Sequence, residues 1–431
     1  MSRKGIFALE EIAENAEVNA TVVDTPVVID ESAGAEDLAE AEGHLAAGEE
    51  IESAADDAAS TVDAIGEIRK EVGNSLAEGG MSEPEARALE VAVEHMCAAI
   101  GMSKKQIFPA MEGFADKKGR IGTTKLAMEN LGEKAKEIGQ RIIKAILAAL
   151  EYAKKFFASL FNAIDGLKKK ADQIVEATKK AEGKDTKGQN VSGGFLGLLT
   201  VDGKYQVGNA LVTAYETHTS SEVIKFDRLT LIKEVAPILE QALSDKDAAS
   251  SDAATAEVME TLKKDLDFEP GDDKYTSEQK LVFGGQSFYL EIKETSARNW
   301  IGDSSNKHDV SELKEAPALS IADVASLASK VSTHMDAYKA LGKDVNVLGG
   351  EFNAIIQKVK AAVAGQGSVT STIYSQIQMV NNLTVGASKM LRSYDVKVSS
   401  AILEYCVKSL KSVPKPEKVD GEAAIAKPAA A

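Results

Sequence analysis

The chain has 431 residues and a formal net charge of −17, with 44% hydrophobic but only 5% aromatic residues. This length suffices for two or three hydrophobic cores, and the heavy use of Ala, Lys and Glu favours helices. No stretch approaches the roughly 18 uncharged apolar residues of a transmembrane helix, and early glutamates argue against a secretory signal. The two cysteines, Cys97 and Cys406, lie far apart in sequence, which disfavours a disulfide framework and is compatible with a reducing cytoplasm.

Nearly all of the net charge lies in the first 80 residues. This segment holds 20 Asp and Glu against four Lys and Arg, so residues 81–431 carry a net charge of about −1. Its single aromatic residue is Phe7. A segment this acidic and this poor in large apolar side chains buries too little surface to offset its ordering entropy. We therefore predict that residues 1–78 form an acidic leader that is disordered or marginally helical.

Residues 79–186 predict a helical domain. The sequence Ser82-Glu83-Pro84-Glu85 has the pattern of a capping box, and Gly101 ends the helix that it begins. A much longer helix is expected from about Thr123 to Ala181, because apolar residues recur there every three or four positions. Lys and Arg fill its opposite face, and residues 101–190 hold 19 basic and 11 acidic residues.

Residues 187–315 predict a mixed α/β region. Its expected elements are a glycine-rich linker over 183–197, a strand and turn over 198–203, helices over 207–218 and 225–243, a polar loop over 244–254, a hairpin over 281–292 and a polar loop over 301–315. Residues 316–411 predict a C-terminal helical domain with helices over 320–338, 351–364 and 369–410, and residues 412–431 predict a disordered tail. The expected fold class is mainly α: long amphipathic helices in bundles with a small β-hairpin insertion.

The sequence carries no recognisable catalytic signature. It has no glycine-rich phosphate loop, no G-x-S-x-G elbow and no C-x-x-C pair. The five histidines are scattered, and His95 and Cys97 point in different directions on the helix predicted there. We therefore expect no catalytic residues, no cofactor and no metal site, and we do not expect an enzyme.

The amphipathic helix over residues 133–180 leaves three interpretations open. The favoured one packs its apolar stripe against other helices. A second places the helix on a membrane through Phe156, Phe157 and Phe161. A third presents its lysines to DNA phosphates, which is compatible with packing because the opposite face is used. The candidate DNA-facing residues are Lys168, Lys169, Lys170, Lys179 and Lys180.

The tripeptide Leu/Ile-x-Glu is enriched in the acidic segment. It occurs five times there, whereas the composition of the segment predicts about two occurrences; the matches end at Glu11, Glu14, Glu40, Glu67 and Glu78. The last match is followed by Gly79 and Gly80, small residues that a protease can bind in extended form.

Several soft motifs together carry a family resemblance. They are the segments 108–114, 124–129 and 131–133, the helix over 142–161, the hairpin over 283–292 and the closing helix over 399–410. With the acidic leader, they resemble the internal head proteins of large contractile-tailed bacteriophages.

This resemblance implies a virion component that is packaged inside the procapsid with the scaffold core. It further implies trimming by a maturation protease that cuts after Leu/Ile/Ala-x-Glu sequences, and here the favoured cut lies between Glu78 and Gly79, with Glu40 and Glu67 as alternatives. The implied partners are capsid and scaffold core proteins, the prohead protease and, weakly and without sequence specificity, packaged DNA. The implied location is the inside of the head, after assembly in the host cytoplasm. The alternative is a membrane-active or host-targeted ejected protein acting through the helix over 133–180.

Overall fold

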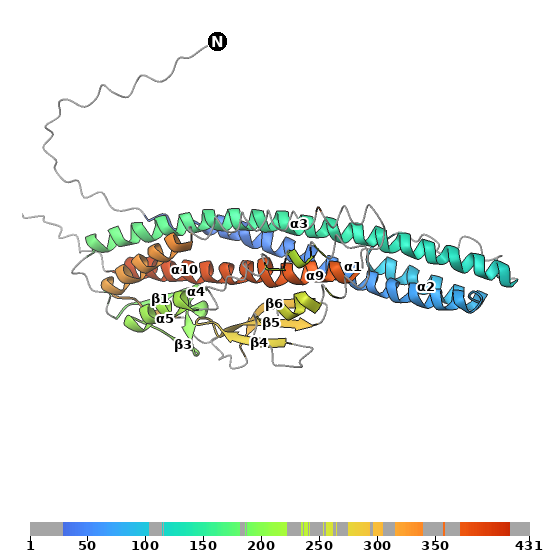
Figure 1. Cartoon of the computed structure of the whole chain (residues 1–431). Helices are drawn as coiled ribbons and strands as arrows, with labels where there is room; N and C mark the ends of the chain where they lie inside the picture. Colours follow the sequence, from blue (N-terminus) through green and yellow to red (C-terminus); the bar gives the residue numbers. More distant parts are fainter. Residues whose placement is uncertain are drawn as a thin grey trace, which may run out of the picture.

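The computed structural model describes residues 29–102, 114–181, 186–221, 275–304, 315–338 and 371–413, with gaps at 115, 187 and 294–295, together with short pieces between 234 and 264 and residue 357. Long helices dominate these residues, and short antiparallel sheets lie along one side of them (Figure 1). The expected mainly α fold with a small β component is therefore confirmed. None of the described helices is long and apolar enough to cross a membrane.

The longest helix is α3, Lys117–Lys180, with 64 residues. At about 1.5 Å per residue it extends for about 96 Å and sets the length of the molecule. It begins where the Asp116 carboxylate accepts a hydrogen bond from the Gly119 N–H at 2.6 Å. Its apolar stripe, which includes Ile138, Ile142 and Phe156, is buried along its length. The helix expected over 123–181 is thus confirmed, with an earlier start.

Helix α1, Ala35–Ala77, lies antiparallel along α3. A Cβ placed on Gly34 would lie 2.6 Å from the Ala163 carbonyl oxygen, and one on Gly80 would lie 2.6 Å from the Arg120 carbonyl carbon. The backbone at each end of α1 therefore contacts the backbone of α3. The α1 side chains buried in the core are Leu38, Ala41, Ala58, Ala59, Val62, Ile65 and Val72.

Residues 35–77 form one continuous helix, so of the two expected states, disordered or marginally helical, the disordered one is wrong for these residues. Alanine has the highest helix propensity and loses no side-chain entropy, so an alanine-rich segment forms a helix readily once a partner covers it. That partner is the apolar stripe of α3, which the composition of the segment alone does not reveal. Residues 1–28 lie outside the described residues.

Helix α2, Glu83–Ala99, follows α1 through a tight turn. Gly79 and Gly80 have φ values of 112° and 90°, a region that residues with a side chain rarely adopt. The predicted capping box is present, because the Ser82 side chain accepts from the Glu85 backbone N–H and the Ser82 N–H donates to the Glu85 carboxylate at 2.7 Å. The turn is fixed to α3 by the Met81 N–H, which donates to the Thr124 hydroxyl at 2.9 Å.

The region after α3 contains more regular structure than a linker. Strand β1, Asn190–Ser192, pairs with β7, Glu315–Pro317, and α4 spans Phe195–Leu198, so the expectation of a linker over 183–197 is wrong for these residues. The glycine-rich local sequence does not predict these elements, because the partner strand of β1 lies more than 120 residues away in the chain. The strand and turn over 198–203 are confirmed as β2, Thr200–Val201, turning into β3, Lys204–Tyr205, and the helix over 207–218 as α5, Asn209–Ser220. The expected helix over 225–243 and loop over 244–254 lie almost wholly outside the described residues.

The largest sheet has three antiparallel strands in the order β4-β5-β6. These are β4, Tyr275–Lys280, β5, Gln286–Lys293, and β6, Ser296–Asp303. The hairpin expected at 281–292 is corrected: residues 281–285 form the turn, and the first strand lies before them. The loop expected from 301 is also wrong for its first residues, because β6 runs to Asp303. Alternate β5 residues, Phe288, Leu290 and Ile292, are buried.

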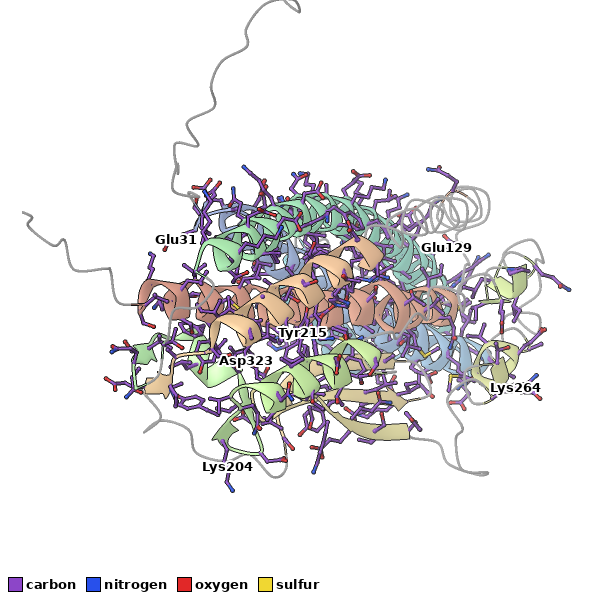
Figure 2. The ribbon with its side chains drawn as sticks, turned by 90° about the vertical axis from the view of Figure 1, so that its left-hand side faces the viewer. Glu31, Glu129, Lys204, Tyr215, Lys264 and Asp323 are labelled. Atoms are coloured by element: carbon purple, nitrogen blue, oxygen red, sulfur yellow. The ribbon has the colours of Figure 1, made fainter. Side chains whose placement is uncertain are left out.

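The C-terminal helices occupy the middle of the molecule. A helix over residues 321–338 is followed, beyond undescribed residues, by α9, Ser371–Asn381, the π-helical turn η2, Asn382–Gly386, and α10, Ala387–Lys411. The helices expected at 320–338 and 369–410 are confirmed, and the π-helical turn within the second is a further finding. Helix α10 lies between α3 and the strands and is buried along most of its length (Figures 1 and 2). The helix expected at 351–364 and the tail beyond 413 lie outside the described residues, apart from residue 357, which is helical.

Candidate functional site

The two longest helices carry opposite charge. Helix α1 has 12 acidic and two basic residues, whereas α3 has 15 basic and seven acidic residues. The interface between the two helices is apolar, so their charged side chains lie along its flanks and attract one another there, outside the core. The α1 carboxylates instead form ion pairs with α10: Glu42 with Lys397 at 3.1 Å and Glu52 with Lys389 at 3.0 Å.

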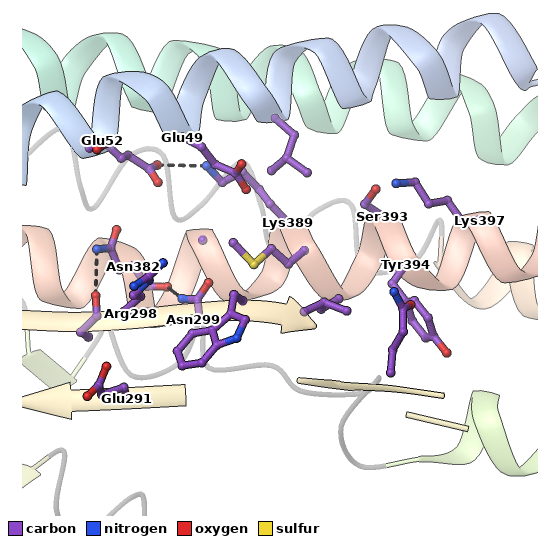
Figure 3. Close-up of a pocket in the computed structure, with 18 of the residues that line it drawn as sticks. Glu49, Glu52, Glu291, Arg298, Asn299, Asn382, Lys389, Ser393, Tyr394 and Lys397 are labelled. Atoms are coloured by element: carbon purple, nitrogen blue, oxygen red, sulfur yellow. Dashed lines mark hydrogen bonds and ion pairs between the residues drawn. The ribbon is translucent and has the colours of Figure 1, made fainter. Parts of the chain in front are cut away.

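A cavity of about 1020 Å³ opens beside these ion pairs, between α1, the β5–β6 side of the sheet and α10 (Figure 3). We call it the α1–α10 groove. Its charged lining residues are Glu49, Glu52, Glu291, Lys293, Arg298, Lys389 and Lys397; its polar ones include Asn299, Asn382 and Ser393.

The most deeply buried cation of the groove is Lys389. Its side chain is 1% exposed, and its ammonium group lies against Glu52, whose side chain is 15% exposed. Gly48 of α1 lies beside it, and a Cβ at that position would make an ordinary contact of 3.6 Å with Lys389 Nζ. Glu52 Oε1 also accepts from the Asn381 amide at 3.3 Å. Burial raises the pKa of the neighbouring Glu49, an effect that Lys389 opposes.

The strand wall of the groove is tied to the π-helical turn. The Asn299 amide donates to the Asn382 backbone carbonyl at 2.5 Å, and the Asn382 amide donates to the Ala297 carbonyl at 3.0 Å. On the same strand, the Arg298 guanidinium lies 5.3 Å from the centre of the Trp300 ring. Trp300 in turn stacks on Tyr289 with ring centres 5.1 Å apart. This packing limits the positions that Arg298 can take at the groove.

A buried acid between two histidines joins three helices below the groove. The Asp395 carboxylate of α10 contacts His218 of α5 and His334 of the 321–338 helix, each at 2.8 Å. Burial alone would raise the pKa of Asp395, but the two histidines hold it well below its usual range. Asp395 and His218 are fully buried, so this cluster joins helices and does not face a substrate. Among the described residues, no group of three or more His, Cys, Asp or Glu is placed to hold a metal ion.

The candidate cleavage residues all lie on α1 or at its end. Glu78 is exposed and caps the C-terminus of α1, directly before the Gly79–Gly80 turn. Glu40 and Glu67 are exposed but lie inside the helix. The cut itself stays a prediction.

The five candidate DNA-facing lysines separate into two groups. Lys170 is 6% exposed and donates to the Glu31 carbonyl at 2.9 Å, so the expectation that it faces DNA is wrong in this fold. Lys168 bridges to Asp336 on the neighbouring helix at 2.9 Å. Lys169, Lys179 and Lys180 are exposed on α3 and remain candidates.

The phenylalanines of α3 serve the core. Phe156 and Phe157 are buried and meet edge to face, with ring centres 5.1 Å apart, and Phe161 packs partly buried against the same core. The favoured interpretation, helix packing, is confirmed for this stripe. The face that a membrane would need is therefore already covered.

Sequence reasoning missed the groove, because its walls come from segments more than 200 residues apart. Two local signals point to it once α1 is known to be a helix. Glu42, Glu49 and Glu52 share one face of α1 at spacings of seven and three, and Lys389, Ser393 and Lys397 repeat every four residues on α10.

A model of the family of phiKZ-like phage internal head proteins matches residues 15–408, a range that includes α1, α3, the groove and most of α10. No curated protein and no solved structure matches the chain.

Proposed function

The chain belongs to the phiKZ-like phage internal head proteins and has a structural role inside the phage head; from this premise we propose that it assembles with the procapsid core, is matured by loss of its acidic leader and associates with packaged DNA. The observation that carries the proposal is the charge distribution. Residues 1–80 hold 20 acidic and four basic residues, and residues 81–431 are nearly neutral. Loss of the leader therefore removes nearly all of the net negative charge that opposes contact with DNA.

The end of α1 is the most accessible of the candidate cleavage sites. Proteases bind extended chain, and helix ends open at lower free energy than helix interiors. At Glu78 the last turn of α1 has to unwind, and the adjacent glycines continue the chain without helix. Glu40 and Glu67 require opening of the helix interior, so we expect cuts there to follow the first.

A single cut after Glu78 does not by itself release α1. Its four large buried aliphatic residues, Leu38, Val62, Ile65 and Val72, contribute about 1.5–3 kcal/mol each. The total of about 6–12 kcal/mol is comparable with the roughly 4–15 kcal/mol lost on association of separate chains. Cuts at Glu40 and Glu67 leave at most two of these residues on any fragment, which then dissociates.

Without the leader, the exposed lysines of α3 contact DNA without sequence specificity. Lys169, Lys179 and Lys180 are exposed near the C-terminal end of α3. Loss of the leader removes the Asp30 carboxylate, which lies 3.9 Å from Lys169 Nζ, whereas the partner of Lys179 is Glu176 of α3 itself. Such binding weakens steeply with salt, by about 0.9 in logarithmic slope for each phosphate contacted.

Intact-mass measurement with N-terminal peptide mapping tests the maturation. We expect protein from mature particles to begin at Gly79 and protein from proheads to be longer. A Glu78→Gln phage should lose this N-terminus, whereas Glu71→Gln, a matched exposed change in the same helix, should retain it. A species beginning at Met1 or Ser2 in mature particles would refute the maturation proposal.

The DNA contact is tested on the protein lacking residues 1–78, purified from mature particles. Changing Lys169, Lys179 and Lys180 to Gln should reduce the salt slope of duplex binding by about two to three units. The matched control changes Lys117, Lys118 and Lys125, exposed lysines at the opposite end of α3. Equal losses in both variants would show that the contact is not local to the first set.

A further inference from the structure

We propose that the α1–α10 groove is a second binding site for the phosphate backbone of duplex DNA, and that carboxylates of α1 occupy it as an intramolecular competitor. This inference rests on the proposed association with DNA but uses a surface distinct from the exposed α3 lysines. The groove would be closed to DNA while α1 is in place and open once α1 is displaced or removed.

The charge of the groove depends on α1. Among the described residues that line it, the strands and α10 supply four cations, Lys293, Arg298, Lys389 and Lys397, and one carboxylate, Glu291. Helix α1 adds the Glu49 and Glu52 carboxylates, and Glu42 reaches Lys397 from just outside. Without α1 the lining is strongly cationic, and with α1 its charge is largely neutralised (Figure 3).

The two α10 lysines that meet α1 carboxylates are far enough apart to contact separate phosphates of one DNA strand. The two helices are antiparallel, so Glu42 meets Lys397 and Glu52 meets Lys389. These lysines lie eight residues apart on α10, a distance of about 12 Å along the helix axis. One strand of a duplex rises by about 3.4 Å per phosphate, so the same lysines span three to four phosphates.

The outer of the two α1–α10 ion pairs is of a kind that another anion can replace. The Glu42 and Lys397 side chains are each 42% exposed, and exposed ion pairs contribute about 0–1 kcal/mol. Glu49 is exposed beside these lysines, and partial desolvation raises its pKa although Lys389 and Lys397 act to lower it. The large buried side chains of α1 belong to the shared core, and its groove side is held by the two ion pairs, by the Gln378 amide, which donates to the Glu52 carbonyl at 3.0 Å, and by Leu45, which lines the groove.

Two cations on the strand wall are already accessible from solvent. The Lys293 side chain is 57% exposed, and Arg298 is exposed while its guanidinium packs over Trp300. An incoming phosphate backbone therefore meets these residues first and then competes with α1 for Lys397 and Lys389.

The test uses the full-length protein and a 20-base-pair duplex, with binding followed by fluorescence anisotropy over a range of salt concentrations. The unmasking variant is Glu42→Gln with Glu49→Gln. The matched control, Glu67→Gln with Glu71→Gln, removes the same charge from exposed α1 positions outside the groove. A third variant adds Arg298→Gln and Lys397→Gln to the unmasking pair.

We expect the unmasking variant to bind about tenfold more tightly at low salt, with a salt slope steeper by about one to two units. The control should change affinity less than twofold, and the third variant should lose the gain. Equal tightening in the unmasking and control variants would reduce the effect to net charge, and no tightening in the unmasking variant would also overturn the proposal. Tighter binding of a synthetic α1 peptide with no gain for DNA would assign the groove to acidic helices instead.

Two measures keep the outcome interpretable. Glu42→Gln alone changes only the exposed ion pair and should give about half of the slope change if the double variant does not fold. The peptide mapping of virion protein described above is independent of the groove, so the maturation proposal and the groove proposal fail separately.

Discussion

The buried Lys389–Glu52 ion pair offers a quantitative test of how α1 is held against the groove. Glu52→Leu removes the carboxylate from an ammonium group whose side chain is 1% exposed. Removing one partner of a buried pair costs about 3–5 kcal/mol, because the remaining charge is left without compensation. Glu52 retains slight exposure, so we expect a loss of about 3 kcal/mol, which is roughly two decades in the unfolding equilibrium.

The double variant, Glu52→Leu with Lys389→Met, should recover most of this loss. Apolar residues of similar volume need no desolvation of charge, and such replacements are often neutral or stabilising. The assay is urea denaturation followed by far-UV circular dichroism and by the fluorescence of Trp300, which lines the groove. The control Glu67→Leu, at an exposed α1 position, should change the free energy of unfolding by less than about 0.5 kcal/mol.

Two results would contradict this reasoning. A loss below about 1 kcal/mol in the single variant would mean that Lys389 finds water or another partner when Glu52 is absent. A double variant as unstable as the single one would mean that the loss comes from packing and not from the unpaired charge.

Three further changes test other parts of the fold. The pKa of Asp395 is lowered in the folded state, so its ionised carboxylate stabilises the fold fully above about pH 4, and this contribution is lost as the pH falls toward the lowered pKa. Asp395→Asn should therefore have a smaller free energy of unfolding than the wild type at pH 7 but lose less of it below about pH 4. Urea denaturation at each pH measures the difference. Ile65→Ala, at a fully buried α1 position, should lower the free energy of unfolding by about 2–5 kcal/mol and speed amide exchange within α1. Gly80→Ala should lower the free energy of unfolding by about 1–3 kcal/mol, since φ is 90° and the new Cβ meets the Arg120 backbone. Gly43→Ala, at a position within α1 that is open to solvent, should raise it by about 0.4–1 kcal/mol in the same urea denaturation assay.

Local chemistry in the sequence predicts the elements that stand on their own. The capping box at Ser82 and the apolar stripe of α3 are properties of neighbouring residues, so α2 and α3 follow directly from them. The hairpin is less well placed, because Leu281–Phe283 is apolar enough for a strand but lies in the turn that buries Phe283. The apolar character of Leu281–Phe283 therefore reflects burial and does not indicate a strand.

The acidic segment shows where local reasoning fails. Its composition indicates too little apolar surface for a core of its own, yet residues 35–77 are helical because α3 provides the other half of the interface. Lys170 shows the converse, since its place in a lysine run suggests a solvated charge, whereas the Glu31 carbonyl and the surrounding helices bury it.

The sequence by itself determined the long helices α3 and α10, the mainly α fold class and the concentration of negative charge before Gly80, because periodicity, capping and charge are carried by residues close in the chain. Only the tertiary structure decided that α1 is folded, that Lys170 is internal and that Glu52 meets Lys389. Each of these depends on contacts between segments that lie from 40 to more than 300 residues apart, and burial and ion pairing are decided by the partner surface and not by the segment itself.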